Sequence, residues 1–187
     1  ISFNKVFTNS KQVTKSSVFI IEKKTKLKKI YIKEAIKKGA IAIISNEFIR
    51  NLPITQFIVV DINQSLLNIL KKIRSNKPLN TIAITGTNGK TSVVWYISQI
   101  LNYNNIPVKS FGTLGYYVNL NKRYSSKLTT PDFSILHQTS YSSKKNLYNY
   151  VFEASSHALS QNRIKDLKVD TAALTNISRD HLDYHKD

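Results

Sequence analysis

The segment Gly86-Thr87-Asn88-Gly89-Lys90-Thr91 combines two glycines, a lysine and a threonine in one short turn. Glycine accepts positive φ angles and close backbone approach, so successive N–H groups can surround phosphate oxygens. Lys90 offers a positive charge for the β and γ phosphates, and the Thr91 hydroxyl can complete a Mg²⁺ shell. The turn therefore predicts a nucleotide phosphate site.

The spacing of this turn is shorter than that of a standard phosphate loop, where four residues separate the two glycines. The standard position of the first glycine falls on Ile84, inside the predicted strand 81–85. A helix is predicted after the turn, with four apolar residues on one face: Val93, Val94, Ile97 and Leu101. A strand, a glycine turn and a helix together favour phosphate binding at the helix N-terminus. The alternative is a structural turn that carries Gly-Lys-Thr by chance.

Glu153 closes a second predicted strand, 147–153, and we expect it at the same sheet edge as the glycine turn. A carboxylate at that edge can bind Mg²⁺ directly or through water; the alternative is a strand-end or helix-capping glutamate. Three polar residues follow on a turn and a short helix, and they are either ligand contacts or ordinary solvated residues: Ser155, Gln161 and Arg163.

Two further polar clusters lie near predicted elements. The segment 175–185 follows a predicted strand, 170–175, and its acidic and histidine side chains gather in six residues: Asp180, His181, Asp183 and His185. A lone histidine is more often a structural hydrogen-bonding residue than a ligand, and spacing does not choose between the two histidines. Thr129 and Thr130 offer hydroxyls just before Pro131, whose fixed φ favours the start of a helix. Threonine capping is an equally good interpretation of that pair.

The predicted fold class is α/β, with a small N-terminal α/β domain at residues 1–77 and a P-loop-type, mostly parallel sheet domain at residues 80–187. In the first domain, β-branched runs predict strands at 16–21, 40–44 and 56–60. Helices are predicted at 31–38, before Gly39, and at 63–75, with a cap near Asn63. The second domain alternates strands and helices, which indicates a parallel sheet with ligands at the carboxyl ends of its strands.

The net charge is +17, from 28 basic and 11 acidic residues, which by itself would suggest a nucleic-acid partner. The lysines are scattered without interleaved aromatic residues, so we predict solvated basic faces and no nucleic acid.

No apolar run reaches the roughly 18–20 residues of a membrane span, and we expect a cytoplasmic protein without a membrane partner. The absence of cysteine excludes disulfides and thiol chemistry. The absence of methionine and the polar C-terminal run suggest a fragment of a longer protein.

Five segments, taken in order, resemble the Mur ligase family: "GTNGKT", "GTLGY", "LTTPD", "EASSHALSQNRI" and "TNISRDHLDYH". The N-terminal "TNSKQVTKSSVFI" is similar to the family's uridine-side segment, with Ser10 at the serine position but Asn9 and Lys11 in place of aspartate and arginine. Folylpolyglutamate synthases share the first segment and remain an alternative. A basic P-loop module that binds nucleic acid and a non-catalytic nucleotide-binding protein are the others.

The resemblance implies an ATP-dependent, monomeric amide ligase of peptidoglycan precursor synthesis that requires Mg²⁺. Its substrates would be UDP-N-acetylmuramoyl-L-alanyl-D-glutamate, activated as an acyl phosphate, and a diamino acid, meso-diaminopimelate or L-lysine. Lys90, Glu153 and His181 would be catalytic, and Thr91, Glu153 and His181 would hold the metal. The implied ATP-binding residues are Gly86, Thr87, Asn88, Gly89, Lys90, Thr91 and Ser92. The implied substrate-binding residues are Ser10, Thr129, Thr130, Ser155, Gln161 and Arg163. We expect the chain by itself to be inactive.

Overall fold

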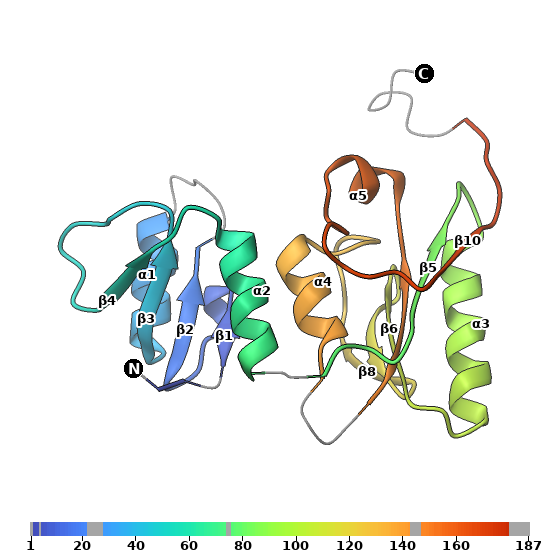
Figure 1. The fold of residues 1–187 in the computed structure, drawn as a ribbon, viewed down its shortest axis with the longest axis horizontal. Helices are drawn as coiled ribbons and strands as arrows, with labels where there is room; N and C mark the ends of the chain where they lie inside the picture. The colour runs from blue at the N-terminus through green and yellow to red at the C-terminus, as the bar shows by residue number, and fades with distance from the viewer. Residues whose placement is uncertain (1, 4, 22–27, 74–75, 143–146, 180–187) are drawn as a thin grey trace. The chain divides into compact units, whose positions relative to one another are not determined.

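The computed structural model describes residues 2–3, 5–21, 28–73, 76–142 and 147–179 (Figure 1). The chain forms two compact units, Ile1–Ile73 and Arg74–Asp187. Each unit combines helices with a sheet that is wholly or mainly parallel, so the predicted α/β fold class is confirmed. Within the described residues, no helix is long and apolar enough to cross a membrane.

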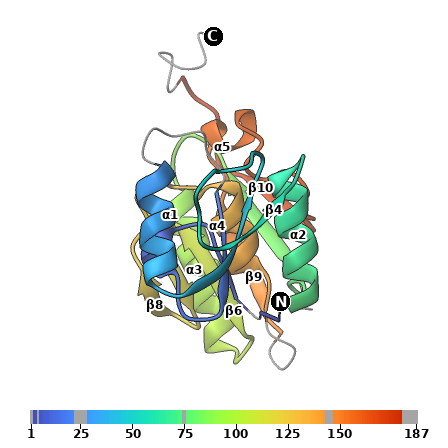
Figure 2. The same cartoon turned by 90° about the vertical axis from the view of Figure 1, so that its left-hand side faces the viewer.

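The first unit is a four-stranded parallel sheet in the order β1-β2-β3-β4. Its strands are β1 (Val6–Phe7), β2 (Ser17–Ile20), β3 (Ala40–Ser45) and β4 (Thr55–Ile58). Its helices are the 3₁₀ turn η1 (Ser10–Gln12), α1 (Lys28–Lys37) and α2 (Ile62–Ile73). In Figure 2, α1 and α2 lie on opposite sides of these strands. The core beneath α1 includes Phe19, Ile32 and Ile43.

The ends of the two helices in this unit follow local chemistry. Gly39 has a φ of 93°, a left-handed conformation suited to glycine just after a helix, as predicted. The cap of α2, predicted near Asn63, lies two residues earlier. Asp61 Oδ1 accepts a hydrogen bond from the Gln64 amide at 2.9 Å, so Asp61 caps the helix. Both residue types are good caps, and periodicity does not separate two positions this close.

The second unit is a six-stranded sheet in the order β10-β5-β9-β6-β7-β8. The first four strands in that order are parallel: β10 (Thr171–Leu174), β5 (Thr81–Thr85), β9 (Asn149–Glu153) and β6 (Val108–Gly112). A hairpin adds β7 (Gly115–Val118) and β8 (Asn121–Tyr124) as antiparallel strands. The helices are α3 (Lys90–Tyr103), α4 (Phe133–Ser140) and α5 (Ser156–Ser160).

Alternate residues of the central strands face two cores, as the two-residue period of a strand requires. Ile84, Val108 and Val151 pack with Val94 of α3, and the predicted apolar face of that helix is confirmed. Ala83, Phe111, Tyr150 and Phe152 pack on the opposite side with Leu136 of α4. In Figure 1, α3 and α4 accordingly lie on opposite sides of β5, β6 and β9. The glycine turn is thus carried by a strand and a helix that are both fixed in the core.

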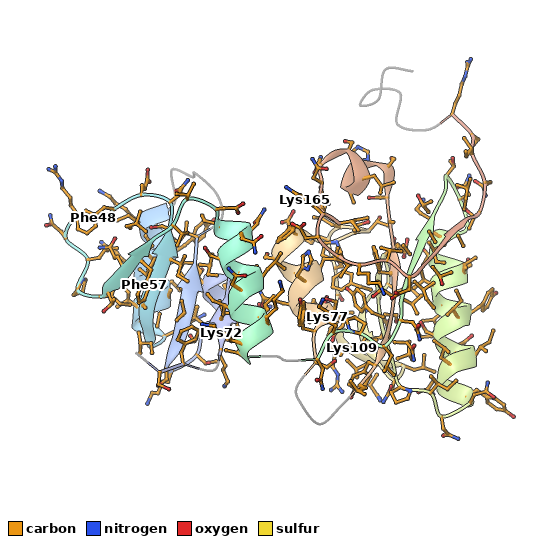
Figure 3. All side chains as sticks on the ribbon, viewed as in Figure 1. Phe48, Phe57, Lys72, Lys77, Lys109 and Lys165 are labelled. Atoms are coloured by element: carbon orange, nitrogen blue, oxygen red, sulfur yellow. The ribbon has the colours of Figure 1, made fainter. Side chains whose placement is uncertain are left out.

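A buried lysine ties the far end of α4 to the sheet. Lys109 of β6, labelled in Figure 3, is 7% exposed, and its ammonium donates to the carbonyls of Thr139 and Tyr141 at 3.1 and 2.8 Å. It also donates to the Ser142 hydroxyl at 2.9 Å. A cation beside the last carbonyls of a helix interacts favourably with the helix dipole. Lys109 therefore acts in the core, unlike the scattered surface lysines.

Candidate nucleotide and metal site

The carboxyl ends of three parallel strands meet at one edge of the second sheet. Residue pairing sets Ile84 of β5 opposite Glu153 of β9, and Phe111 of β6 opposite Phe152. The glycine turn leaves this edge after β5, and Glu153 is the last residue of β9. The predicted parallel arrangement of 81–85, 147–153 and 170–175, with the glycine turn and Glu153 at one edge, is confirmed.

The glycine turn adopts a conformation that needs both glycines. Gly86 has a φ of 130° and Gly89 a φ of 83°, and Gly89 is the N-cap of α3. The Lys90 ammonium donates to the carbonyls of Gly86 and Thr87 at 2.6 and 2.8 Å. A lysine ammonium has three donors and the described residues supply no third acceptor, so one N–H remains to reach a ligand. The lysine charge is thereby held beside the turn.

The backbone amides of the turn are not equivalent. Those of Thr87 and Asn88 donate to the backbone and side-chain oxygens of Asn176 at 3.1 and 3.0 Å. The amides in the first turn of α3 have no acceptor within the helix, and the described part of the chain supplies none to Lys90, Thr91 or Ser92. The N-terminus of α3, more than the glycine turn ahead of it, therefore offers free donors to an anion.

Glu153 is 1% exposed, and three donors hold its carboxylate. Oε2 accepts from the hydroxyls of Thr91 and Thr113 at 2.9 and 3.2 Å, and Oε1 accepts from the Thr113 amide at 2.7 Å. A Cβ on Gly112 would lie 2.1 Å from Oε1, so only glycine leaves room for this orientation. The Thr91 and Glu153 oxygens are close enough to share one cation.

Gly112 and Thr113 carry no signal of their own in the sequence, and reasoning from residue chemistry missed them. They lie in "GTLGY", a segment noted for its resemblance without an assigned role. The Thr113 hydroxyl also lies 3.3 Å from that of Thr129, which connects the predicted Thr129 to the same cluster. A small pocket opens beside Thr91 and Glu153, with other walls that include Trp95, Leu114 and Tyr117.

The other predicted substrate residues of this unit form a second cluster next to Glu153. The Thr130 hydroxyl donates to the Glu153 carbonyl at 2.6 Å and accepts from the Ser155 amide at 2.9 Å. Arg163 donates to the Thr130 carbonyl at 2.8 Å and to Gln161 Oε1 at 2.9 and 2.5 Å. These residues are thus brought together, and part of their hydrogen-bonding capacity serves the fold.

The local structure at three positions here differs from the predictions or adds to them. Ser155 is the N-cap of α5, since its hydroxyl accepts from the Ala158 amide at 3.3 Å. Pro131 does not begin α4, because Asp132 is the N-cap and the helix starts at Phe133. Thr130 is not a helix cap either, since its hydroxyl points to β9.

The remaining two predicted site residues are Ser10 and His181. Ser10 belongs to the first unit, is 4% exposed, and donates to Glu34 Oε2 at 2.6 Å, which lowers the pKa of the Glu34 carboxyl. His181 lies outside the described residues, as do Asp180, Asp183 and His185. Within the described residues, no three or more histidine, aspartate or glutamate side chains gather as a metal site.

Comparison with known proteins decides the family. Residues 84–187 match the family described as the Mur ligase middle domain. The chain belongs to the Mur ligase family. A Mur ligase relative from Rickettsia bellii (strain RML369-C), named UDP-N-acetylmuramoyl-L-alanyl-D-glutamate--2,6-diaminopimelate ligase, is 40% identical over 160 residues, which are 83% of this chain and 33% of the relative. A protein of the same name from Wigglesworthia glossinidia brevipalpis is 36% identical and is matched over 100% of this chain and 40% of its own length.

Solved structures of Mur ligases share the fold. A structure named for the same diaminopimelate ligase has a TM-score of 0.67 and 28% identity, covering 98% of this chain and 38% of that one. The MurF ligase from Thermotoga maritima in complex with ADP has a TM-score of 0.62 and 22% identity, covering 96% and 39%, and it supports the fold alone. The chain thus spans about two fifths or less of the Mur ligases that it matches.

Proposed function

We propose that the whole protein is an ATP-dependent amide ligase of peptidoglycan precursor synthesis, and that this chain carries its nucleotide site. The observation that supports this most directly is the 2.9 Å contact between Thr91, at the start of α3, and the buried carboxylate of Glu153. Lys90 adjoins it with a free donor. The names of the relatives suggest UDP-N-acetylmuramoyl-L-alanyl-D-glutamate and 2,6-diaminopimelate as substrates. We further propose a monomeric, cytoplasmic enzyme without a nucleic-acid partner.

In this proposal the N-terminus of α3 binds the phosphates of ATP. The amides of Lys90, Thr91 and Ser92 donate to phosphate oxygens, and Gly89 lets the nucleotide approach the backbone closely. The Lys90 ammonium turns its third N–H towards the β and γ phosphates, where charge grows during phosphoryl transfer. These groups are fixed before the reaction, so little reorganisation opposes the transition state.

Thr91 and Glu153 fit a Mg²⁺ site, and His181 is the third proposed ligand. The described hydrogen-bond partners of Glu153 are neutral hydroxyl and amide groups, so its buried negative charge would gain from a cation. Mg²⁺ favours one or two carboxylate ligands together with substrate phosphates and water. When bound, it would neutralise phosphate charge and polarise the transferred group.

The proposed reaction has two steps. A terminal carboxylate oxygen of the nucleotide-peptide attacks the γ phosphorus of ATP, giving an acyl phosphate and ADP. The amine of the diamino acid then attacks the acyl carbon, which expels phosphate, loses a proton and forms the amide. Thr129, Ser155 and Gln161 would orient the carboxylate, and Thr130, whose hydroxyl already donates to the Glu153 carbonyl, would hold Glu153 and Ser155 in place. Arg163 retains two N–H groups without partners among the described residues, and they can clamp an anion.

The test uses the whole protein that contains this chain. Incubation with ATP, Mg²⁺, UDP-N-acetylmuramoyl-L-alanyl-D-glutamate and meso-diaminopimelate should give ADP, phosphate and the amide product, detected by mass spectrometry. L-lysine in place of diaminopimelate tests the second candidate amine, and glutamate with a folate substrate tests the alternative ligase. Release of ADP without any amide product from these amines would overturn the proposal.

Binding to the chain itself can be followed separately. Trp95 is the one tryptophan of the sequence and lines the pocket beside Thr91 and Glu153, so its fluorescence reports on that site. Titration with ADP in the presence of Mg²⁺ should change the Trp95 emission until the site is saturated.

A further inference from the structure

The glycine turn is held by a short segment that comes about 90 residues later in the chain. This segment, Thr175–Ser178, follows β10, and we call it the brace. The Thr175 hydroxyl donates to the Asn88 carbonyl at 2.6 Å and lies 3.2 Å from the Thr85 carbonyl. Asn176 contacts both peptide groups of Asn88, because Oδ1 accepts from the Asn88 amide at 3.0 Å and Nδ2 donates to its carbonyl at 3.1 Å.

Further contacts extend the brace to Thr87. The Thr87 amide donates to the Asn176 carbonyl at 3.1 Å. The Thr87 hydroxyl accepts from the Ser178 amide at 2.9 Å and donates to the Ser178 carbonyl at 3.1 Å. Gly86 is pressed against the same segment, since a Cβ there would lie 2.1 Å from Thr175 Oγ1 and 2.8 Å from the Asn176 carbonyl oxygen. The brace therefore contacts each of the first three residues of the turn.

These contacts separate the peptide groups of the turn into two sets. The amides of Thr87 and Asn88 and the Asn88 carbonyl are used by the brace, whereas the first amides of α3 remain available for an anion. Glycines give the turn many unfolded conformations, and fixing those before binding lowers the entropy lost when the nucleotide arrives. The brace thus supplies an order that the local sequence does not.

We propose that Thr175 and Asn176 are positioning residues, which hold the glycine turn in the conformation that binds nucleotide phosphates. They act through Asn88 and Thr87 and need not touch the nucleotide. This inference rests on the proposed nucleotide site and adds two residues to it, neither of which has acid, base or nucleophilic chemistry of its own at neutral pH.

A pair of substitutions at Thr175 separates positioning from packing. Valine has the shape of threonine without the hydroxyl, and serine keeps the hydroxyl without the methyl group. If Thr175 positions the turn, Thr175→Val should raise the Kd for ADP in the presence of Mg²⁺ about tenfold, the equivalent of 1.4 kcal/mol. Thr175→Ser, which keeps the hydroxyl, should retain most of the wild-type affinity. A packing role predicts the reverse order of the two variants, which would overturn the inference.

Asn176→Ala provides a second test. Asn176 is exposed, so its truncation removes hydrogen bonds without emptying a core, and we expect a loss of affinity of about tenfold or more. The control is Asn104→Ala at the other end of α3, where an exposed asparagine also donates to a backbone carbonyl, that of Ile100, at 2.7 Å. Affinity is measured on the full chain by Trp95 fluorescence and by calorimetry.

Amide hydrogen exchange in the nucleotide-free chain gives a readout that does not depend on binding. Exchange at Thr87 and Asn88 should accelerate in Asn176→Ala, while exchange in the core strand β9 should not change. Unchanged exchange at both amides, or unchanged affinity in Asn176→Ala and Thr175→Val, would overturn the positioning role. A wild-type chain that binds no ADP would instead overturn the proposed nucleotide site. In that case, comparing amide exchange at Thr87 and Asn88 between wild type and Asn176→Ala would still reveal whether the brace orders the turn.

Discussion

Two carbonyl groups already hold the Lys90 ammonium, so its position is set before a phosphate binds. In the whole protein, Lys90→Ala should lower kcat by about 10²–10³, because a fixed charge at the developing phosphate negative charge is lost. The fold should persist, since the lysine is the first residue of α3 and fills no core. The measurements are kcat at saturating nucleotide-peptide and circular dichroism. Lys33→Ala, an exposed lysine of α1, is the control, and a turnover equal to wild type in Lys90→Ala would remove the lysine from the site.

Gly112 is constrained by the carboxylate that it faces. In Gly112→Ala, the added methyl group would meet Glu153 Oε1 at 2.1 Å, so the carboxylate must turn away from Thr91 and Thr113. We expect a loss of about 1–3 kcal/mol of stability from crowding. We also expect Mg²⁺ to strengthen ADP binding less than in wild type, measured as the ratio of the ADP affinity with Mg²⁺ to the ADP affinity with a chelator. If that ratio stays at the wild-type value, Glu153 does not contribute to metal-dependent binding.

At the scale of elements, α4 is joined to the segment after α5 by a histidine. His137 is 1% exposed, and its Nε2–H donates to the Lys165 carbonyl at 2.9 Å, while Nδ1 is buried without a partner among the described residues. Burial lowers the pKa of His137 below its ordinary value of 6.5, and the Lys165 carbonyl and Asp166 oppose that shift only in part. The folded protein therefore favours neutral imidazole.

This shift gives a stability that depends on pH. Below about pH 6.5 the unfolded chain binds a proton that the folded chain resists, so stability present above that pH is lost as the pH falls towards the lower folded pKa. Urea unfolding at pH 7.5 and 5.5 should show a smaller decrease in His137→Gln than in wild type, because the amide keeps the donor and does not titrate. Equal decreases in the two proteins would assign the pH dependence to other groups.

The same scale shows how far sequence reasoning reaches. Apolar periodicity predicted β5, α3 and β9 because each depends on near neighbours in the chain, and the order of these elements put Glu153 at the edge of the glycine turn. The brace could not be predicted, since its contacts join residues 88 positions apart and nothing in "TNISRDHLDYH", the segment that contains Asn176, indicates its partner. Ser10 shows a second limit of sequence reasoning. Its position in the motif gives no information about its hydrogen bond to Glu34.

For the whole molecule, the dominant quantity is the net charge of +17. Like charges repel more strongly in the compact state than in the unfolded chain, so the thermal unfolding midpoint should rise with salt. The Debye length falls from about 30 Å at 0.01 M to about 8 Å at 0.15 M. The distances between surface lysines lie within this range, so added salt screens their repulsion. Differential scanning calorimetry across that range measures the effect. A midpoint that falls over this range would mean that favourable ion pairs outweigh the repulsion.

The distance along the chain between Asn88 and Asn176 also has a consequence during synthesis. At about 5–20 residues per second, the ribosome adds the intervening 88 residues in roughly 4–18 s. Throughout that interval the glycine turn has been made and its partner has not. ATP in the surrounding solution can therefore stabilise the finished protein but has no ordered turn to bind on the nascent chain, and slow codons between the two asparagines would prolong that interval.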